Sequence, residues 1–199
     1  MIITASGEGW FKIQTGGVTL LIEGVNAEKT RMKPDIFIRT SHTMMDLSEN
    51  AFVIKGPGEY ELKGIFVRGF ASLSQYRGET RPSTFYTIEL EDASLCFLGP
   101  INSSDLKDSL DDLKEGVDVL FIPIGGEGVL EASEAYKLAV SLEPKVIIPM
   151  HFGLVGKKDS LKTFLKEGGE ENLSAVDKLT LRKKDLVGKV GEIVVLTQV

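Results

Sequence analysis

The pattern of hydrophobic and polar positions changes about halfway along the chain. Up to residue 100, short β-branched and aromatic stretches are separated by glycine, proline and charged residues, which is typical of consecutive strands. Residues 10–14 and 18–22 flank Thr15-Gly16-Gly17, a glycine-bearing hairpin turn. Residues 71–84 are polar and predict a loop. The other strands predicted in this half are 35–39, 52–54, 59–62, 65–68, 85–90 and 94–98.

The second half alternates strands with helices. Leucines at helical spacing predict a helix that begins after Ser103 or Ser104 and ends at Gly116. Two further helices are predicted at 131–142 and at 160–167, the latter with Asp159 as its cap. The predicted strands are 117–122, 146–149, 179–182 and 192–196. Strands followed by β/α alternation predict an α/β fold in which helices cover the outer faces of sheets, with residues 1–199 forming one domain.

Composition excludes several classes of partner. The 199 residues are 42% hydrophobic and 26% charged, which is ordinary for a globular protein, and the net charge is −6. This acidic balance gives no basic surface for nucleic acid or anionic lipid. The N-terminus does not resemble a signal peptide, and the apolar runs are far shorter than the roughly 20 residues that span a bilayer. We therefore expect no nucleic-acid or membrane partner and a cytoplasmic location.

The number of soft metal ligands is unusually small. The whole chain contains two histidines, His42 and His151, and one cysteine, Cys96. A structural zinc site made of cysteine and histidine needs four such ligands, so this sequence cannot form one. A histidine-rich two-metal centre is excluded by the same count. A single cysteine also excludes a disulfide within the chain.

Both histidines follow a predicted strand. His42 and Asp46 come directly after the strand at 35–39, and His151 comes after the strand at 146–149. Polar side chains at the exit of a strand are common in functional sites, because the scaffold fixes the loop there. The alternative, that each histidine is simply a surface or hydrogen-bonded residue, stays open at this point.

Several strings, taken together and in order, resemble the metallo-β-lactamase superfamily. More narrowly, they resemble its small metal-dependent hydrolases of the L-ascorbate-6-phosphate lactonase-like type. The strings are Gly56–Glu61 (GPGEYE), Leu95–Gly99 (LCFLG), Val117–Gly126 (VDVLFIPIGG) and Pro144–His151 (PKVIIPMH). The resemblance implies a four-layer αββα sandwich with a metal site at one edge, between the two sheets.

The sequence departs from the family at most of its metal ligands. The family motif His-x-His-x-Asp-His aligns with residues 42–47, where His42 and Asp46 match. The second and third histidines of the motif are Met44 and Leu47. The terminal histidine of the family matches His151, whereas the bridging aspartate is Pro100 and a strand position that is often histidine is Phe97. The resemblance therefore implies that His42, Asp46 and His151 are a vestigial ligand set, too small to hold a catalytic metal centre.

Other chemistry-bearing residues have simpler interpretations. Cys96 lies between Leu95 and Phe97, which favours a buried structural thiol over a nucleophile. A Ser-His-Asp triad is a further alternative; it would draw its serine from Ser72, Ser74 and Ser83 and use His151 and Asp46. Three arginines, Arg68, Arg77 and Arg81, are either cleft-lining residues that attract an anionic ligand or ordinary surface residues.

Two hypotheses for function follow. In the first, the protein has lost most metal ligands, needs no cofactor, and is a non-hydrolytic binding or assembly module that associates with itself or with an intact paralogue. In the second, it is a metal-dependent hydrolase with a reduced site, in which Asp46 and His151 hold one weakly bound zinc. The resemblance implies a phosphorylated or lactone-type small molecule as the substrate of such a hydrolase. Ligand count favours the first hypothesis.

Overall fold

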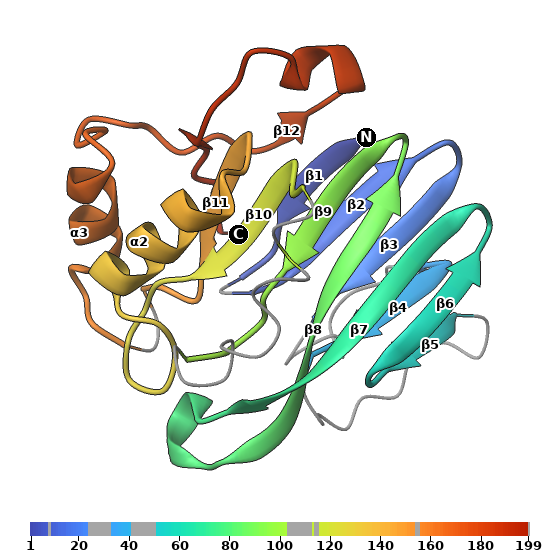
Figure 1. Ribbon diagram of the computed structural model, residues 1–199, viewed down its shortest axis with the longest axis horizontal. Helices are drawn as coiled ribbons and strands as arrows, with labels where there is room; N and C mark the ends of the chain where they lie inside the picture. Colours follow the sequence, from blue (N-terminus) through green and yellow to red (C-terminus); the bar gives the residue numbers. More distant parts are fainter. Residues whose placement is uncertain are drawn as a thin grey trace.

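Two sheets lie face to face in the computed structural model of the chain (Figure 1). The structure describes residues 1–7, 9–23, 33–40, 51–102, 113, 116–153 and 156–198. The six-stranded sheet has the order β12-β1-β2-β3-β4-β5, and the seven-stranded sheet has the order β13-β11-β10-β9-β8-β7-β6. The α/β sandwich expected from the sequence is confirmed by this arrangement.

The six-stranded sheet is mixed. Its strands are β1 (Ile2–Ala5), β2 (Phe11–Thr15), β3 (Val18–Ile22), β4 (Ile36–Arg39), β5 (Phe52–Lys55) and β12 (Leu179–Thr180). The hairpin β2–β3 is antiparallel, as the glycine turn predicts, whereas β3, β4 and β5 run parallel to one another. The parallel strands therefore have their carboxyl ends at the same edge.

The seven-stranded sheet is also mixed. Its strands are β6 (Gly58–Leu62), β7 (Ile65–Ser74), β8 (Arg81–Leu90), β9 (Ala93–Phe97), β10 (Val119–Pro123), β11 (Val146–Met150) and β13 (Glu192–Ile193). Strands β9, β10, β11 and β13 are parallel, and β6 to β9 form an antiparallel meander. Every residue of β10 and β11 is buried. Such continuously apolar strands are expected in a parallel sheet that is covered on both faces.

Two helices cover the outer face of the seven-stranded sheet, as Figure 1 shows. Helix α2 (Ala132–Leu142) buries Ala132, Ala135, Ala139 and Leu142, and the three alanines let the helix approach the sheet closely. Helix α3 (Ser160–Glu167) packs beside it, with the Phe164 ring 5.8 Å from the Tyr136 ring. Both helices lie within one residue of the ranges predicted from the sequence.

The main core fills the space between the two sheets. Phe11 of β2 packs edge-on against Phe121 of β10 and Phe97 of β9, with ring centroids 4.8 and 5.7 Å apart. All three rings are at most 2% exposed. These edge-to-face contacts join the six-stranded sheet to the seven-stranded one.

Two parts of the sequence prediction were wrong. The polar stretch 71–84 is not a loop, because β7 runs on to Ser74, β8 begins at Arg81, and the two pair over this length. A short 3₁₀ turn, Tyr76–Gly78, connects them. Strand β1 was not predicted at all. The helix predicted after Ser103 lies outside the described residues, apart from Leu113, which is buried.

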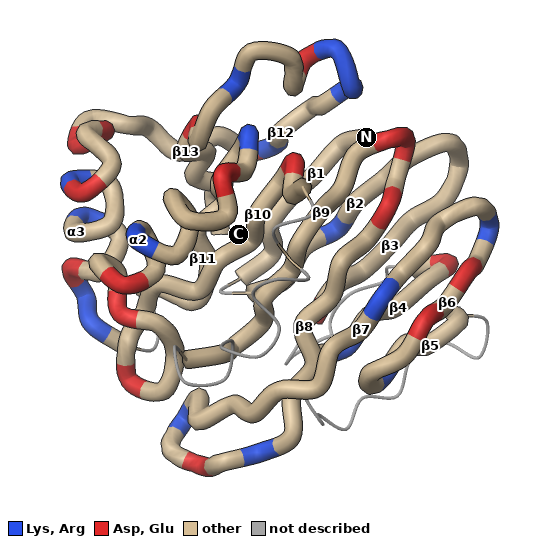
Figure 2. Tube along the Cα trace, in the orientation of Figure 1, with Lys and Arg blue, Asp and Glu red and all other residues tan. Residues whose placement is uncertain are grey.

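The surface shows no single-sign face in the view of Figure 2, where acidic and basic positions are interspersed over the helices and over the β5–β7 side. Among the described residues, no helix is long and apolar enough to cross a membrane.

Candidate functional site

The carboxyl ends of several strands meet at one edge of the sandwich. Thr40 follows β4, and its carbonyl oxygen accepts a 2.8 Å hydrogen bond from the Thr84 amide of the facing sheet. Gly99 follows β9 and has a φ of 65°; a Cβ added there would lie 2.8 Å from Thr40 Cβ. The two sheets therefore touch where β4 and β9 end. Carboxyl ends of strands are where α/β folds usually place their ligands.

His151 stands at this edge, directly after β11. Its backbone is in the left-handed region, with a φ of 52°, and the residue is 6% exposed. The Tyr76 ring meets the imidazole edge-on, with centroids 4.9 Å apart. Gly9 closes the other approach, since a Cβ added there would lie 2.5 Å from His151 Cε1. Residues distant in sequence thus form a fitted niche around one imidazole.

This niche keeps the imidazole neutral. Burial, together with the nearby charge of Arg77, lowers the pKa of His151 to about 4. Among the described residues, neither Nδ1 nor Nε2 has a hydrogen-bond partner. An imidazole that is neutral at physiological pH with both nitrogens unpartnered has the protonation state that metal ligation requires.

The other predicted ligands do not gather around it in the described part of the chain. His42 and Asp46, together with Met44 and Leu47, lie outside the described residues, so their part in a site stays a prediction. No group of three or more histidine, cysteine, aspartate or glutamate residues that could hold a metal is found among the residues that are described. The described residues thus offer a resident metal fewer than three such ligands in one place, whereas a catalytic zinc usually takes three from the protein.

Phe97 and Pro100, which the resemblance aligns with family ligands outside the motif, are both buried. Phe97 is fully buried and packs against Phe11 and Phe121. Pro100 is buried as well, directly after Gly99. An aromatic ring and a pyrrolidine ring cannot ligate a metal, and here Phe97 has a packing role that a charged or polar ligand would not fill.

Glu23 is a buried carboxylate that sequence reasoning did not select. It follows β3 with a φ of 56° and is 5% exposed. Its Oε1 accepts a hydrogen bond from the Thr40 amide, and its own amide donates to the Ile38 carbonyl oxygen at 2.9 Å. Glu23 therefore fixes the exit of β4. The only sequence signal was its place directly after a strand, where the resemblance leads one to expect an aspartate.

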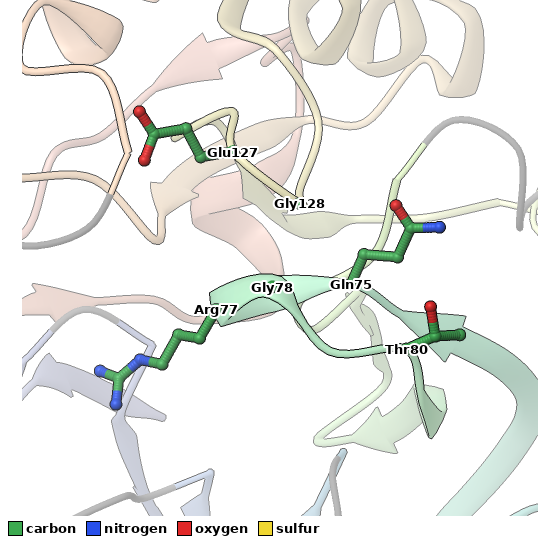
Figure 3. Close-up of a pocket in the computed structure, with 6 residues that line it drawn as sticks. All are labelled: Gln75, Arg77, Gly78, Thr80, Glu127 and Gly128. Carbon is green, nitrogen blue, oxygen red and sulfur yellow. The ribbon is translucent and has the colours of Figure 1, made fainter.

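A pocket of about 560 Å³ opens beside Tyr76 (Figure 3). It lies between the β7–β8 connection and the loop after β10, and its lining residues are Gln75, Arg77, Gly78, Thr80, Glu127 and Gly128. In Figure 3 the side chains of Arg77 and Glu127 extend to one side of the pocket and those of Gln75 and Thr80 to the other. Gly128 must be glycine, because its φ is 101° and a Cβ would lie 2.3 Å from the Gln75 carbonyl oxygen. The pocket therefore combines one positive and one negative side chain on a tightly apposed backbone.

Of the three arginines considered from the sequence, two form ordinary surface contacts and one lines the pocket. Arg68 pairs with Glu59 at 3.7 Å and covers the Phe70 ring, and Arg81 pairs with Glu79. Only Arg77 of the three predicted arginines lines the pocket beside Tyr76.

Among the described residues, none of the three candidate serines is hydrogen-bonded to His151, and the cysteine is buried. No serine donates to His151 in the described part of the structure, so the triad hypothesis finds no Ser–His hydrogen bond there. Ser74 Oγ instead accepts the Tyr76 amide at 3.2 Å. Cys96 is fully buried, and burial raises the pKa of its thiol, which agrees with the structural role expected from the sequence.

Comparison with known proteins places this geometry in a family. The sequence profile described as "Beta-lactamase superfamily domain" matches residues 3–151. A UPF0173 protein of Pyrococcus abyssi is 25% identical, over 78% of this chain and 85% of its own length. Among solved structures, a candidate zinc-dependent hydrolase of the metallo-β-lactamase superfamily from Thermotoga maritima superposes with a TM-score of 0.75 at 22% identity, covering 98% of this chain and 97% of that one. The diiron β-hydroxylase CmlA of Streptomyces venezuelae superposes with a TM-score of 0.65 at 13% identity, over 91% of this chain and 54% of that one.

Proposed function

The chain belongs to the metallo-β-lactamase superfamily, and from that premise we propose that it is a non-hydrolytic member, a binding or assembly module that keeps the fold without the two-metal centre. The L-ascorbate-6-phosphate lactonase-like branch remains the narrower part of this proposal, because the matched profile and the relatives identify the superfamily only.

One observation supports the proposal: Phe97, which the resemblance aligns with a family ligand position, lies in the hydrophobic core. Phe97 stands at a strand position that is often histidine in the family, and it is fully buried between Phe11 and Phe121. Restoring a ligand there would put an unpaired polar group into an apolar cluster, at a cost of several kcal/mol by the usual estimates of about 2–7. The packing of Phe97 therefore supports a structural role for this position.

The ligand count of the whole chain points the same way. Two histidines are present, and Met44 and Leu47 occupy two of the motif's histidine positions. Neither Leu47 nor Pro100 has a side chain that binds metal, and a methionine thioether suits soft ions such as Cu(I) better than zinc. The described residues contain no cluster of three candidate ligands, carboxylates included.

The proposed partner of an assembly module is a second copy of the chain or an intact paralogue. Both sheets end in an edge strand on the same side of the molecule, β5 and β6 (Figure 1). Phe52 on β5 and Phe66 on β7 are 47% and 40% exposed. Unpaired strand edges beside exposed aromatic rings are a common means of association between chains.

The second candidate is a hydrolase with a reduced site, and a specific observation favours it. Both nitrogens of His151 are buried and unpartnered, and the imidazole is neutral. With Asp46 as a further ligand, His151 would hold a zinc that supplies Lewis acidity and an activated water when bound. This hypothesis keeps the phosphorylated or lactone-type substrate that the sequence resemblance implies.

Metal analysis of protein purified without a histidine tag distinguishes the binding module from the hydrolase with a reduced site. The binding-module proposal predicts well below one zinc, manganese or iron per chain and a thermal midpoint that added Zn²⁺ does not move. A site that is saturated a hundredfold above its Kd would add about 2.7 kcal/mol, which raises the midpoint of a chain this size by several degrees. A stoichiometric metal that disappears in His151→Gln but not in the surface control Lys137→Gln would overturn the proposal in favour of the hydrolase.

Light scattering across a concentration series tests assembly. The proposal predicts a dimer or larger species, or a complex with an intact paralogue when the two are mixed. Substituting Phe52 with serine should weaken self-association while leaving the fold intact, because this ring is half exposed. The assembly role would be contradicted if the protein is monomeric at every workable concentration and does not bind the paralogue.

A further inference from the structure

A second cavity lies where helices α2 and α3 begin. Its volume is about 550 Å³, and it shares no lining residue with the pocket beside Tyr76. It is lined by residues 131–133 at the start of α2, by residues 157–160 at the start of α3, and by Thr163. The volume is within the roughly 300–1,000 Å³ of pockets that hold small molecules.

The topology brings the two helix N-termini to the same edge of the sheet. Strands β10 and β11 are parallel neighbours; α2 follows β10, and α3 follows β11. Both helices therefore begin where these strands end, and Figure 1 shows the helices side by side. The carboxyl ends of parallel strands are where α/β folds usually place their ligands.

The loops that lead into the two helices are joined through their backbones. The Lys157 amide donates to the Gly125 carbonyl oxygen at 2.8 Å. A Cβ added to Gly156 would lie 2.3 Å from the same oxygen, so the two chain segments are in direct contact there. The helix starts are thus fixed relative to each other, and binding would not have to order them.

Each helix begins with backbone amides that have no acceptor within the helix. Glu131 and Asp159 occupy the N-cap positions, but neither side chain makes a capping hydrogen bond. The first amides to donate back to the cap carbonyl oxygens are those of Ala135 in α2 and Thr163 in α3. The amides of residues 132–134 and 161–162 precede these bonds and remain available as donors. Such amides at helix N-termini are a common means of binding phosphate.

A buried hydroxyl lies at the same place. Ser160 is the first residue of α3, lines the cavity and is only 4% exposed. Its Oγ has no hydrogen-bond partner among the described residues. By contrast, Ser133 of α2 donates its hydroxyl to Glu167 at 2.8 Å. Buried hydroxyls in native proteins are nearly always hydrogen-bonded, so an unpartnered one beside helix N-termini points to an acceptor that binds there.

The electrostatic field of the cavity favours an anion. The lining contains two lysines, Lys157 and Lys158, and two carboxylates, Glu131 and Asp159, so the side-chain charges balance. Lys157 Nζ pairs with Glu131 Oε2 at 2.8 Å. Each helix N-terminus is equivalent to about +0.5 elementary charge, so two of them add about one positive charge to this balanced lining.

We propose that the cavity between the N-termini of α2 and α3 binds the phosphoryl group of a small molecule. The amides of both helix starts and the Ser160 hydroxyl donate to its oxygens. A phosphoryl group fits donors from two helices better than a carboxylate does, because it presents three acceptor oxygens and up to two negative charges. The site uses no metal and does not rest on the proposed function, so the two proposals can fail independently.

A heteronuclear NMR titration of the full chain with inorganic phosphate and with methyl phosphate tests the proposal. Acetate is a further arm, and chloride controls for ionic strength. Saturable shifts are expected for the amides of residues 132–134 and 160–162 with both phosphates. Chloride should leave these amides unchanged at equal ionic strength, and acetate should bind more weakly than either phosphate.

Two variants should move the affinity in opposite directions. Ser160→Ala removes one donor and should weaken methyl phosphate binding about threefold, with an unchanged thermal midpoint, because the hydroxyl has no partner to lose. Glu131→Gln removes a negative charge beside the helix starts and should tighten binding about threefold. It removes no cap, because this side chain makes no capping hydrogen bond. The control Glu171→Gln removes the same charge from an exposed position beyond the carboxyl end of α3 and should leave the affinity unchanged.

The gain of affinity in Glu131→Gln cannot arise from loss of folding, so it keeps the test decisive. The proposal would be overturned by the absence of saturable shifts with both phosphates, or by shifts confined to other parts of the chain. Equal affinity in wild type, Ser160→Ala and Glu131→Gln would also overturn it. Acetate binding as tightly as the phosphates, or inorganic phosphate binding without methyl phosphate, would refute the assignment to a phosphorylated small molecule.

Discussion

Lowering the pH should reduce the free energy of unfolding of this protein through the titration of a single histidine, His151. The pKa of His151 is lowered in the folded state from 6.5 to about 4 by burial and by the charge of Arg77. The unfolded chain therefore binds a proton on this residue between these pH values, whereas the folded chain does not. The stability contributed by the neutral imidazole is complete above pH 6.5 and is lost as the pH falls toward 4.

The size of the effect follows from the same two values. At about 1.4 kcal/mol per pH unit, the full interval corresponds to about 3 kcal/mol. Between pH 7 and pH 5 the folded state should lose about 2 kcal/mol through His151 alone. Whole domains are stable by only about 5–15 kcal/mol, so this loss is readily measured.

Urea unfolding of chelator-treated protein at pH 7 and pH 5 measures this loss of folding stability. Carboxylates titrate over the same range, so the quantity that matters is the difference between wild type and His151→Gln, in which the carboxylates cancel. His151→Gln should lose about 2 kcal/mol less than wild type between the two pH values. Since His42 is the only other histidine, a His42→Gln variant leaves one imidazole for a proton NMR titration. An NMR midpoint at pH 6 or above, or equal acid losses in wild type and His151→Gln, would refute the reasoning.

Three further predictions concern the packing of buried residues. Gly9→Ala places its Cβ 2.5 Å from His151 Cε1, so the ring must move about 0.9 Å to reach an ordinary 3.4 Å contact; we expect a loss of about 1–3 kcal/mol in urea unfolding. In a His151→Ala background the same change should cost under about 0.5 kcal/mol, and equal costs in both backgrounds would show that the two residues do not meet. Phe97→Ala should cost about 3–5 kcal/mol, because it empties a fully buried position between two aromatic rings; a loss under about 1 kcal/mol would mean that the ring is not packed there. Cys96 should resist a thiol reagent such as DTNB in the native state and react fully in urea, since the thiol is buried and its pKa is raised; rapid native reaction would contradict this burial.

Local signals in the sequence were sufficient for much of the fold. The hairpin at Gly16-Gly17 lies within one residue of its predicted range, and the helix Ser160–Glu167 has the range predicted, because turn chemistry and helical periodicity act over a few residues. Asp159 does occupy the cap position of α3, but its side chain makes no capping hydrogen bond. The position of a helix start was thus predictable, whereas its hydrogen bonding was not.

The errors occurred where tertiary pairing overrides local polarity. Residues 71–74 and 81–84 are polar, yet they extend the β7–β8 hairpin, because the ladder of backbone hydrogen bonds does not depend on apolar side chains. Strand β1 has only four residues and is held between β2 and β12, which is far away in the sequence. No local window contains β12, so the pairing was not visible from the chain.

The candidate site was predictable only where local sequence signals were enough. His151 was identified from its place after a buried strand, and the structure confirms that it stands at the strand-end edge. Its neighbours Gly9 and Tyr76 were not identified, because they come from distant turns that only the folded chain brings together. Glu23 was passed over because a single glutamate after a strand carries no distinctive spacing.

A neutral, unpartnered imidazole does not by itself make a metal site. The niche around His151 explains why the ring is neutral without any metal, because burial alone lowers the pKa of a histidine. A metal ligand differs from a packed side chain because other donor atoms lie within bonding distance of the same ion. A catalytic zinc usually needs three protein ligands. Tyr76, Arg77 and Gly9 are among the described neighbours of the ring; none of the three is a usual ligand, and Arg77 carries a positive charge that repels a cation. A cation entering this niche would have to overcome that repulsion with help from His42 or Asp46, and for this reason metal analysis of His42→Gln is as informative as that of His151→Gln. If neither substitution changes the metal content, His151 belongs to the packing of the fold; if both abolish a bound metal, the strand-end edge still performs the chemistry of its family.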